Sequence, residues 1–288
     1  MEMSPAEQKI WRALPAGAAE AIAGLSGSQL QTLLLSVARD RAAQVRPADL
    51  VRRWRQDRFV RPAAADPRRV SRAEARLWEL LPADVYGTQL SPVVPLGTVT
   101  AVAPLSQNRI VTAMRAVEVL SDPTNALAIE AAARRDTDDE VHVAAAHQVL
   151  RAQVFAPGMG AHFRLFALVS SARDTGSGRT EARLLARHLA YWQQVLAPVE
   201  QARVQYTIFG SEVLRERIAE MQPSPLLVEE PQRERGRGYY TGAALRITAG
   251  DAELGDGGFT TWTAQMRADA KERCLISCIS IDRLATLI

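Results

Sequence analysis

Four apolar segments constrain the fold of this chain more than any other feature. They read VHVAAAHQVLRAQVF from residue 141, HFRLFALVSSA from residue 162, RVQYTIFG from residue 203 and CLISCISI from residue 274. A helical pattern at 125–135 precedes the first segment and another at 180–196 separates the second from the third, but the order does not repeat as regular strand–helix–strand units. We therefore predict an α+β domain built on a mostly antiparallel sheet flanked by helices.

The N-terminal part of the chain follows a different pattern. Residues 1–60 predict a small helical unit, in which Ser28 is expected to cap one helix and Pro47 to open another. The segment RPAAADPRR then predicts a linker. Ser71 and Glu74 indicate a capping box for a helix over 71–81. The expected organisation is a helical unit 1–60, a linker 61–70 and a main domain 71–288.

Composition excludes few functions. The chain of 288 residues is long enough for a sizeable core, and no apolar stretch is long enough to span a bilayer. The start of the chain lacks the apolar core of a signal peptide, so we expect a cytoplasmic protein with no membrane partner. The net charge of +3 is too small to indicate nucleic-acid binding by itself.

The cysteines and histidines do not predict a metal site or a disulfide. Cys274 and Cys278 lie in one predicted strand, which would hold their Cα atoms roughly 13 Å apart and prevent a disulfide. The four histidines show no HExxH or paired Cys/His spacing, so zinc is not expected.

The segment RGRGYYTGAALRITAGDAELGDGGF, from residue 235 to residue 259, raises a question of function. The alternation over Leu245–Thr248 is typical of a half-buried strand, and Gly250-Asp251 and Gly255-Asp256 indicate turns. A β-hairpin explains the shape but not the arginines.

The same segment resembles a signature of histidyl-tRNA synthetases. Residues 235–242, RGRGYYTG, resemble the family's RGLDYYTG, and residues 255–259, GDGGF, resemble the start of its GGGRYDGL turn. Other family elements follow in the correct order. The helix 71–81 and the strand with Pro92 look like motif 1 of class II synthetases, and SDPT at 121–124 looks like the family's RPEGT loop.

Motifs 2 and 3 of the class are also recognisable. VLRAQVFAPGMGAHF resembles motif 2, with Arg151 retained and Gln153 where glutamate is usual, and ISCISIDRLATL resembles motif 3, with Arg283 retained and its glycines replaced. The resemblance covers about 71–288 and leaves no room for an anticodon-binding domain. It therefore implies a paralogue of the catalytic domain, not a complete tRNA-charging enzyme.

The resemblance implies an ATP site that serves a carboxylate-activating reaction. Arg151 would hold the α-phosphate, Arg283 would contact the γ-phosphate and adenine, and Arg235 would face the reacting carboxylate. Gln153 and Phe163 would complete the nucleotide site, with Mg²⁺ as the accompanying ion. Arginine suits these roles because its planar fork contacts phosphate oxygens bidentately. The alternative for each arginine is a salt-bridged or solvated residue.

The substrate pocket departs from the family. Leu165 and Val169 stand where the family places a glutamine and a glutamate against histidine, so histidine is not the expected substrate. The resemblance leaves Asp122, Thr124 and Tyr240, with Gly257 and Gly258, as expected substrate-binding residues. The tyrosines have a second interpretation, since adjacent aromatic residues commonly pack in sheets.

Three functions stay open on this basis. The first is a ligase that adenylates an amino acid or other small carboxylate. The second is a non-catalytic regulatory paralogue, like the regulatory subunit of ATP phosphoribosyltransferase, which binds a ligand and a partner protein. The third is an RNA-binding adaptor that uses the basic N-terminal helices. A homodimer is expected because motif 1 forms the subunit interface in this fold class.

Overall fold

The computed structural model describes residues 3–103, 105–155, 160–220 and 224–288. Its centre is an eight-stranded sheet with the order β1-β5-β6-β11-β10-β9-β7-β8. All neighbouring pairs are antiparallel except the two at the edges, β1 with β5 and β7 with β8. The mostly antiparallel sheet is therefore confirmed. The strands are β1 (Tyr86–Gly87), β5 (Glu140–Leu150), β6 (His162–Arg173), β7 (Ala202–Ile208), β8 (Leu227–Glu229), β9 (Thr241–Ala249), β10 (Ala252–Thr260) and β11 (Glu272–Ser280).

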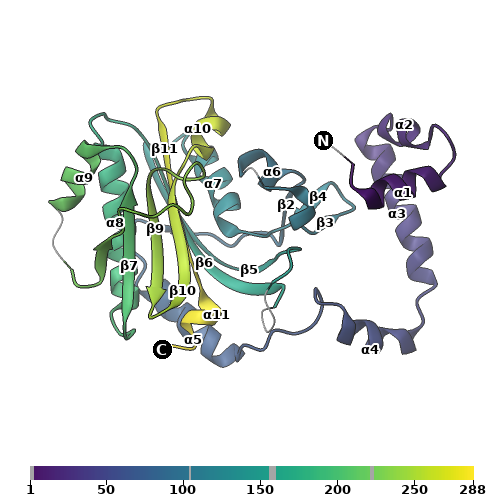
Figure 1. Ribbon diagram of the computed structural model, residues 1–288, viewed down its shortest axis with the longest axis horizontal. Coiled ribbons are helices and arrows are strands. Elements are labelled where there is room, and N and C mark those ends of the chain that lie inside the picture. Colours follow the sequence, from purple (N-terminus) through teal and green to yellow (C-terminus); the bar gives the residue numbers. More distant parts are fainter. Residues whose placement is uncertain (1–2, 104, 156–159, 221–223) are drawn as a thin grey trace.

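Helices cover both faces of this sheet (Figure 1). One core joins the sheet to α5 (Pro67–Glu79), α8 (Arg179–Leu196), α9 (Glu212–Ala219) and α11 (Ile281–Leu284). The other core joins it to α6 (Thr98–Val102), α7 (Pro123–Arg134) and α10 (Trp262–Arg267). We call these the α8 face and the α7 face. Strand alternation divides neighbouring residues between them, so that Leu275 packs on the α8 face and Ile276 on the α7 face.

The N-terminal helices stand apart from the sheet (Figure 1). They are α1 (Pro5–Ala13), α2 (Ala18–Ala23), α3 (Gly27–Ala43) and α4 (Pro47–Gln56), and none of them contains a buried residue. The segment after α4 returns to the sheet, where Arg58 donates hydrogen bonds to the carbonyls of Ala152 and Gln153 after β5. His162 at the start of β6 contacts the carbonyl of Arg61 at 2.8 Å.

A small second sheet lies beside α6. It has the order β2-β4-β3, from β2 (Val93–Pro95), β3 (Thr112–Ala113) and β4 (Val117–Val119), and a 3₁₀ turn at Gln107–Arg109 lies between β2 and β3 in the chain. The strand after Pro92 therefore belongs to this sheet, while the strand beside β5 is the two-residue β1.

Several local expectations were wrong. Ser26, not Ser28, caps α3, because its side chain accepts from the Gln29 backbone while Gln29 returns the bond. The helix expected at 71–81 begins at Pro67 and is capped by Asp66, so Ser71 lies inside it. In each case an equally good capping residue precedes the predicted one in the sequence, and spacing alone does not decide between the two.

The GDGGF segment is also not a turn. It lies within β10, where its glycines allow a very close approach of β11. A Cβ on Gly255 would lie 2.0 Å from the Cys278 carbonyl oxygen, and one on Gly257 would lie 2.3 Å from that of Ile276. Glycine is required here by strand contact and not by turn conformation.

Candidate functional site

The start of α7 brings three of the expected site residues together. Asp122 is the N-cap of this helix and accepts from the Thr124 backbone at 3.0 Å and from the Thr124 hydroxyl at 2.7 Å. The other carboxylate oxygen of Asp122 accepts from Arg151 Nη2 at 3.3 Å, and Arg151 Nε donates to the Ser121 carbonyl at 2.8 Å. Thr124 is buried, so its main role in this structure is to hold the Asp122 carboxylate.

Arg151 also faces the aromatic residue expected to lie in the nucleotide site. Its guanidinium carbon lies 5.1 Å from the centre of the Phe163 ring, within cation–π range. Gln153 lies close by in the chain, and its backbone carbonyl accepts from Arg58 at 2.7 Å. The end of β5 and the start of β6 thus place Arg151 and Phe163 as an adjacent pair.

The tyrosine pair lies just before β9 and covers part of the α7 face. Tyr239 and Tyr240 pack edge to face with ring centres 4.9 Å apart, and Tyr239 packs on Trp262 at 6.1 Å. A Cβ on Gly258 would lie 2.5 Å from the Tyr240 ring, so this glycine makes room for the aromatic side chain. The Tyr240 hydroxyl donates to Asp256 Oδ2 at 3.2 Å.

The other two expected arginines meet at Glu253 on β10. Arg235 Nη1 donates to Glu253 Oε2 at 2.8 Å, and Arg283 donates to the backbone carbonyl of Glu253. Arg283 is exposed at the start of α11, whose cap is the Ser280 hydroxyl. Arg235 and Arg283 therefore form one group around Glu253, and Arg151 forms another with Asp122.

The Asp122 group and the Glu253 group both act electrostatically on Asp256. Burial raises the pKa of Asp256, and the negative charges of Asp122 and Glu253 raise it further. Burial also raises the pKa of Tyr239, with contributions from Asp122 and Asp256. Asp256 thus lies within electrostatic reach of both carboxylates that hold the arginines.

Three residues of this region were missed by sequence reasoning. Asp256, Glu253 and Tyr239 lie in or beside the quoted motif, but only the structure shows that the two acids point toward the site. A register shift between Glu253 and Gly255 interrupts the alternation of β10, which hides this from sequence periodicity. The tyrosine doublet was the one signal that marked the place.

Leu165 and Val169, which stand where the family places polar residues, are part of the apolar interior. Both residues are buried, with exposures of 5% and 1%, and Val169 belongs to the core of the α7 face. Neither side chain offers a hydrogen bond to a ligand.

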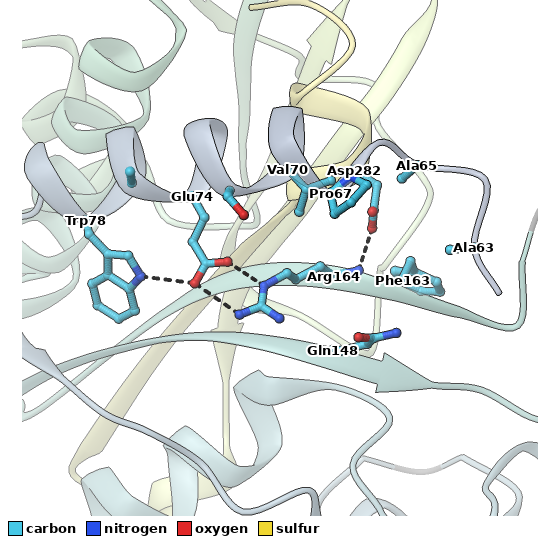
Figure 2. Close-up of a pocket in the computed structure, with 12 residues that line it drawn as sticks. Ala63, Ala65, Pro67, Val70, Glu74, Trp78, Gln148, Phe163, Arg164 and Asp282 are labelled. Carbon is cyan, nitrogen blue, oxygen red and sulfur yellow. Dashed lines mark hydrogen bonds and ion pairs between the residues drawn. The ribbon is translucent and has the colours of Figure 1, made fainter. Parts of the chain in front are cut away.

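A separate cavity of about 540 Å³ lies beside α5. Figure 2 shows Glu74 on α5 bound to Arg164 on β6 through both carboxylate oxygens, at 2.5 and 3.1 Å, and Asp282 bound to the Arg164 backbone. Phe163 is the only one of the expected site residues that lines it. Its Glu74 and Arg164 pair with each other and its Asp282 accepts from a backbone amide, so it differs in character from the site at the tyrosines.

Comparison with known proteins identifies the architecture. No protein-family model and no curated protein matches the chain. Among solved structures, an ATP phosphoribosyltransferase regulatory subunit/histidyl-tRNA synthetase from Bacillus halodurans aligns with a TM-score of 0.60 at 11% identity, over 80% of this chain and 83% of that one. A histidine–tRNA ligase subunit from Alicyclobacillus acidocaldarius aligns with a TM-score of 0.59 at 12% identity, over 77% and 93% of the two chains.

The histidyl-tRNA synthetase of S. aureus aligns with a TM-score of 0.54 at 14% identity, over 76% of this chain and 64% of that one. The chain has the class II synthetase-like fold. In this class II-like chain, the segments that resemble motifs 2 and 3 form β5 with β6 and β11 with α11. The likeness establishes the fold, and the identities of 11–14% leave the activity to be argued from the site.

No helix in the described parts of the chain is long and apolar enough to cross a membrane.

Proposed function

We propose that the chain binds ATP and activates a small carboxylate as its adenylate. The observation that carries the proposal is the placement of Arg151 over Phe163, beside the N-terminus of α7 and within one region with Arg235 and Arg283. In such a reaction a carboxylate oxygen attacks the α-phosphorus, the bond to the bridging oxygen breaks, and pyrophosphate leaves. Arginines that already face this region would stabilise the spreading negative charge.

The contacts of these arginines define how ATP would enter. Among the described residues, Arg151 uses Nε and Nη2 for Ser121 and Asp122, and Nη1 has no hydrogen-bond partner. Arg235 and Arg283 each use one nitrogen at Glu253. Phosphates would therefore compete with few existing bonds. Mg²⁺ would serve as counter-ion to the triphosphate, and we propose it only in that role.

The first test measures binding. We expect ATP with Mg²⁺ to raise the melting temperature, and Arg151→Ala or Arg283→Ala to weaken binding about tenfold to more than a hundredfold, the loss typical of a charge-assisted contact. Arg217→Ala is a matched control, because Arg217 on α9 bonds the Ser177 carbonyl far from these groups. An unchanged melting temperature with ATP would remove the nucleotide site from the proposal.

A second function is favoured by one contact. The Glu253 carboxylate pairs with Arg235 and its backbone carbonyl accepts from Arg283, so both arginines are already engaged, as suits a regulatory paralogue better than an enzyme. Pyrophosphate exchange across a panel of amino acids and small carboxylates separates the two. Exchange with one carboxylate supports the ligase, and ATP binding without exchange supports the regulatory protein.

A further inference from the structure

A row of polar side chains crosses the sheet beside the tyrosine pair. Asp256 on β10 is the cross-strand partner of Arg246 on β9, and Arg246 is the partner of Gln205 on β7. Such partners have Cβ atoms about 4.5–5.5 Å apart on one face. The row lies on the α7 face, because the adjacent Val204 and Leu245 pack in the core of the α8 face.

A fourth residue joins the row from the end of β8. Glu230 Oε1 accepts from Arg246 Nη1 at 3.4 Å. Asp256, Arg246, Gln205 and Glu230 are together called the polar row. Its connection to the site described above is direct, since the Tyr240 hydroxyl donates to Asp256 at 3.2 Å.

The polar row contains buried atoms that lack partners. Within the described residues, Gln205 Oε1, Glu230 Oε2 and Arg246 Nε are buried and make no hydrogen bond. Native proteins satisfy most such atoms, so an unsatisfied group calls for a ligand or water. Two of the three are acceptors, and Asp256 is a further acceptor whose one hydrogen bond comes from Tyr240. The missing partner is therefore mainly a donor.

Charge points the same way. The row holds two carboxylates, and its one cation, Arg246, contacts a single oxygen of Glu230. The charge of the buried Arg233 also acts on Asp256, and its Nε and Nη1 donate to the backbone carbonyls of Arg235 and Leu245, not to the row. A donor that also carries positive charge would complete the row best.

We propose that the polar row binds a cationic amino or guanidino group, so that the ligand of this site is a small carboxylate of the basic amino-acid class. The inference rests on the proposed function, in which the carboxylate faces the arginines. The cationic end then extends across β9 and contacts Asp256, Gln205 and Glu230.

Thermal shifts of the full chain test this with matched probes. L-lysine is compared with L-norleucine, and L-arginine with L-citrulline, each with and without ATP and Mg²⁺. The side chain of the second amino acid in each pair is uncharged. We expect one cationic probe to bind at least tenfold more tightly than its uncharged counterpart. Asp256→Asn and Glu230→Gln should each reduce that preference at least tenfold. Glu229→Gln is the matched control, because Glu229 is the partner of Tyr206 on the other face and binds Arg215.

The outcomes separate this inference from the proposed function. Equal shifts with charged and uncharged probes, or no shift with any of the four, overturn the polar row as a cation site, whatever ATP does. A preference for the charged probe that survives in both variants also overturns it. If the variants remove the preference for the charged probe, the polar row is supported as a cation site. If ATP does not change the melting temperature in the same experiments, only the nucleotide site is contradicted.

Discussion

His188 shows how one buried side chain makes the stability of this protein depend on pH. It lies on α8 at 1% exposure, and its ring nitrogens contact the hydroxyls of Ser170 at 2.9 Å and Ser277 at 2.8 Å. Ser277 also accepts from Trp192 Nε1 at 2.8 Å, which leaves its own proton for His188 Nδ1. The neutral ring with its proton on Nε2 satisfies this arrangement.

Burial lowers the pKa of His188 to about 3, with smaller contributions from the positive charges of His142 and Arg187. The unfolded chain binds a proton near pH 6.5 and the folded chain does not. The contribution of neutral His188 to the free energy of unfolding is therefore full above pH 6.5. It declines as the pH falls toward 3, by about 1.4 kcal/mol per pH unit.

Urea unfolding at pH 7, 6 and 5 measures this slope, and His188→Gln should flatten it. Glu140, whose pKa is lowered to about 2 mainly by His142 and Arg183 against the effect of burial, loses its contribution only below about pH 4.5. Burial also lowers the pKa of His147, so part of the slope should remain in the variant. A slope between pH 7 and 5 that is unchanged in His188→Gln would contradict the assignment.

Among contacts between elements, one buried ion pair joins the C-terminal end of α7 to β11. Arg135 Nη2 binds Glu272 Oε1 at 2.9 Å with side-chain exposures of 6% and 2%, and Ser171 donates to Glu272 Oε2 at 3.2 Å. Removing one charge of a buried pair leaves the other unpaired. We expect Glu272→Gln to lower the free energy of unfolding by about 3–5 kcal/mol in denaturant titrations.

The exposed pair between Arg187 and Asp84 provides the control. Asp84 has 58% side-chain exposure, so Asp84→Asn should cost less than about 1 kcal/mol. Similar losses in the two variants would show that the Glu272 carboxylate is not desolvated as the structure indicates.

For the whole molecule, the contrast between the N-terminal helices and the sheet predicts independent folding. Helices α1–α4 bury no residue, whereas α5 buries Ala73 and Leu77. Deleting residues 1–60 should therefore leave a cooperative melting transition close to that of the full chain. Deleting residues 1–79 should abolish it. A molten product from the shorter deletion would show that residues 1–60 are needed for the sheet domain to fold. The contacts that Arg58 makes after β5 would then be the first to test by substitution.

The homodimer expected from motif 1 stays a prediction, as does a protein partner.

Sequence alone determined the main elements and the class of fold. The strands near 141, 162, 203 and 274 and the helices α7 and α8 were predicted because runs of apolar residues with period 2 or 3.6 are local signals. The order of the motifs predicted the class II-like fold for the same reason, since each motif is a short segment. Ser26 and Asp66 were missed because neighbouring polar residues compete for the cap.

The site required the tertiary structure. Arg151 contacts Asp122, 29 residues before it in the chain. Arg235 and Arg283 both contact Glu253, from 18 residues before it and 30 residues after it. Asp256 faces the tyrosines only because β10 shifts register where its glycines pack on β11. Spacing along the chain carries no information about such contacts, since the pairing of β9, β10 and β11 decides which side chains share a face.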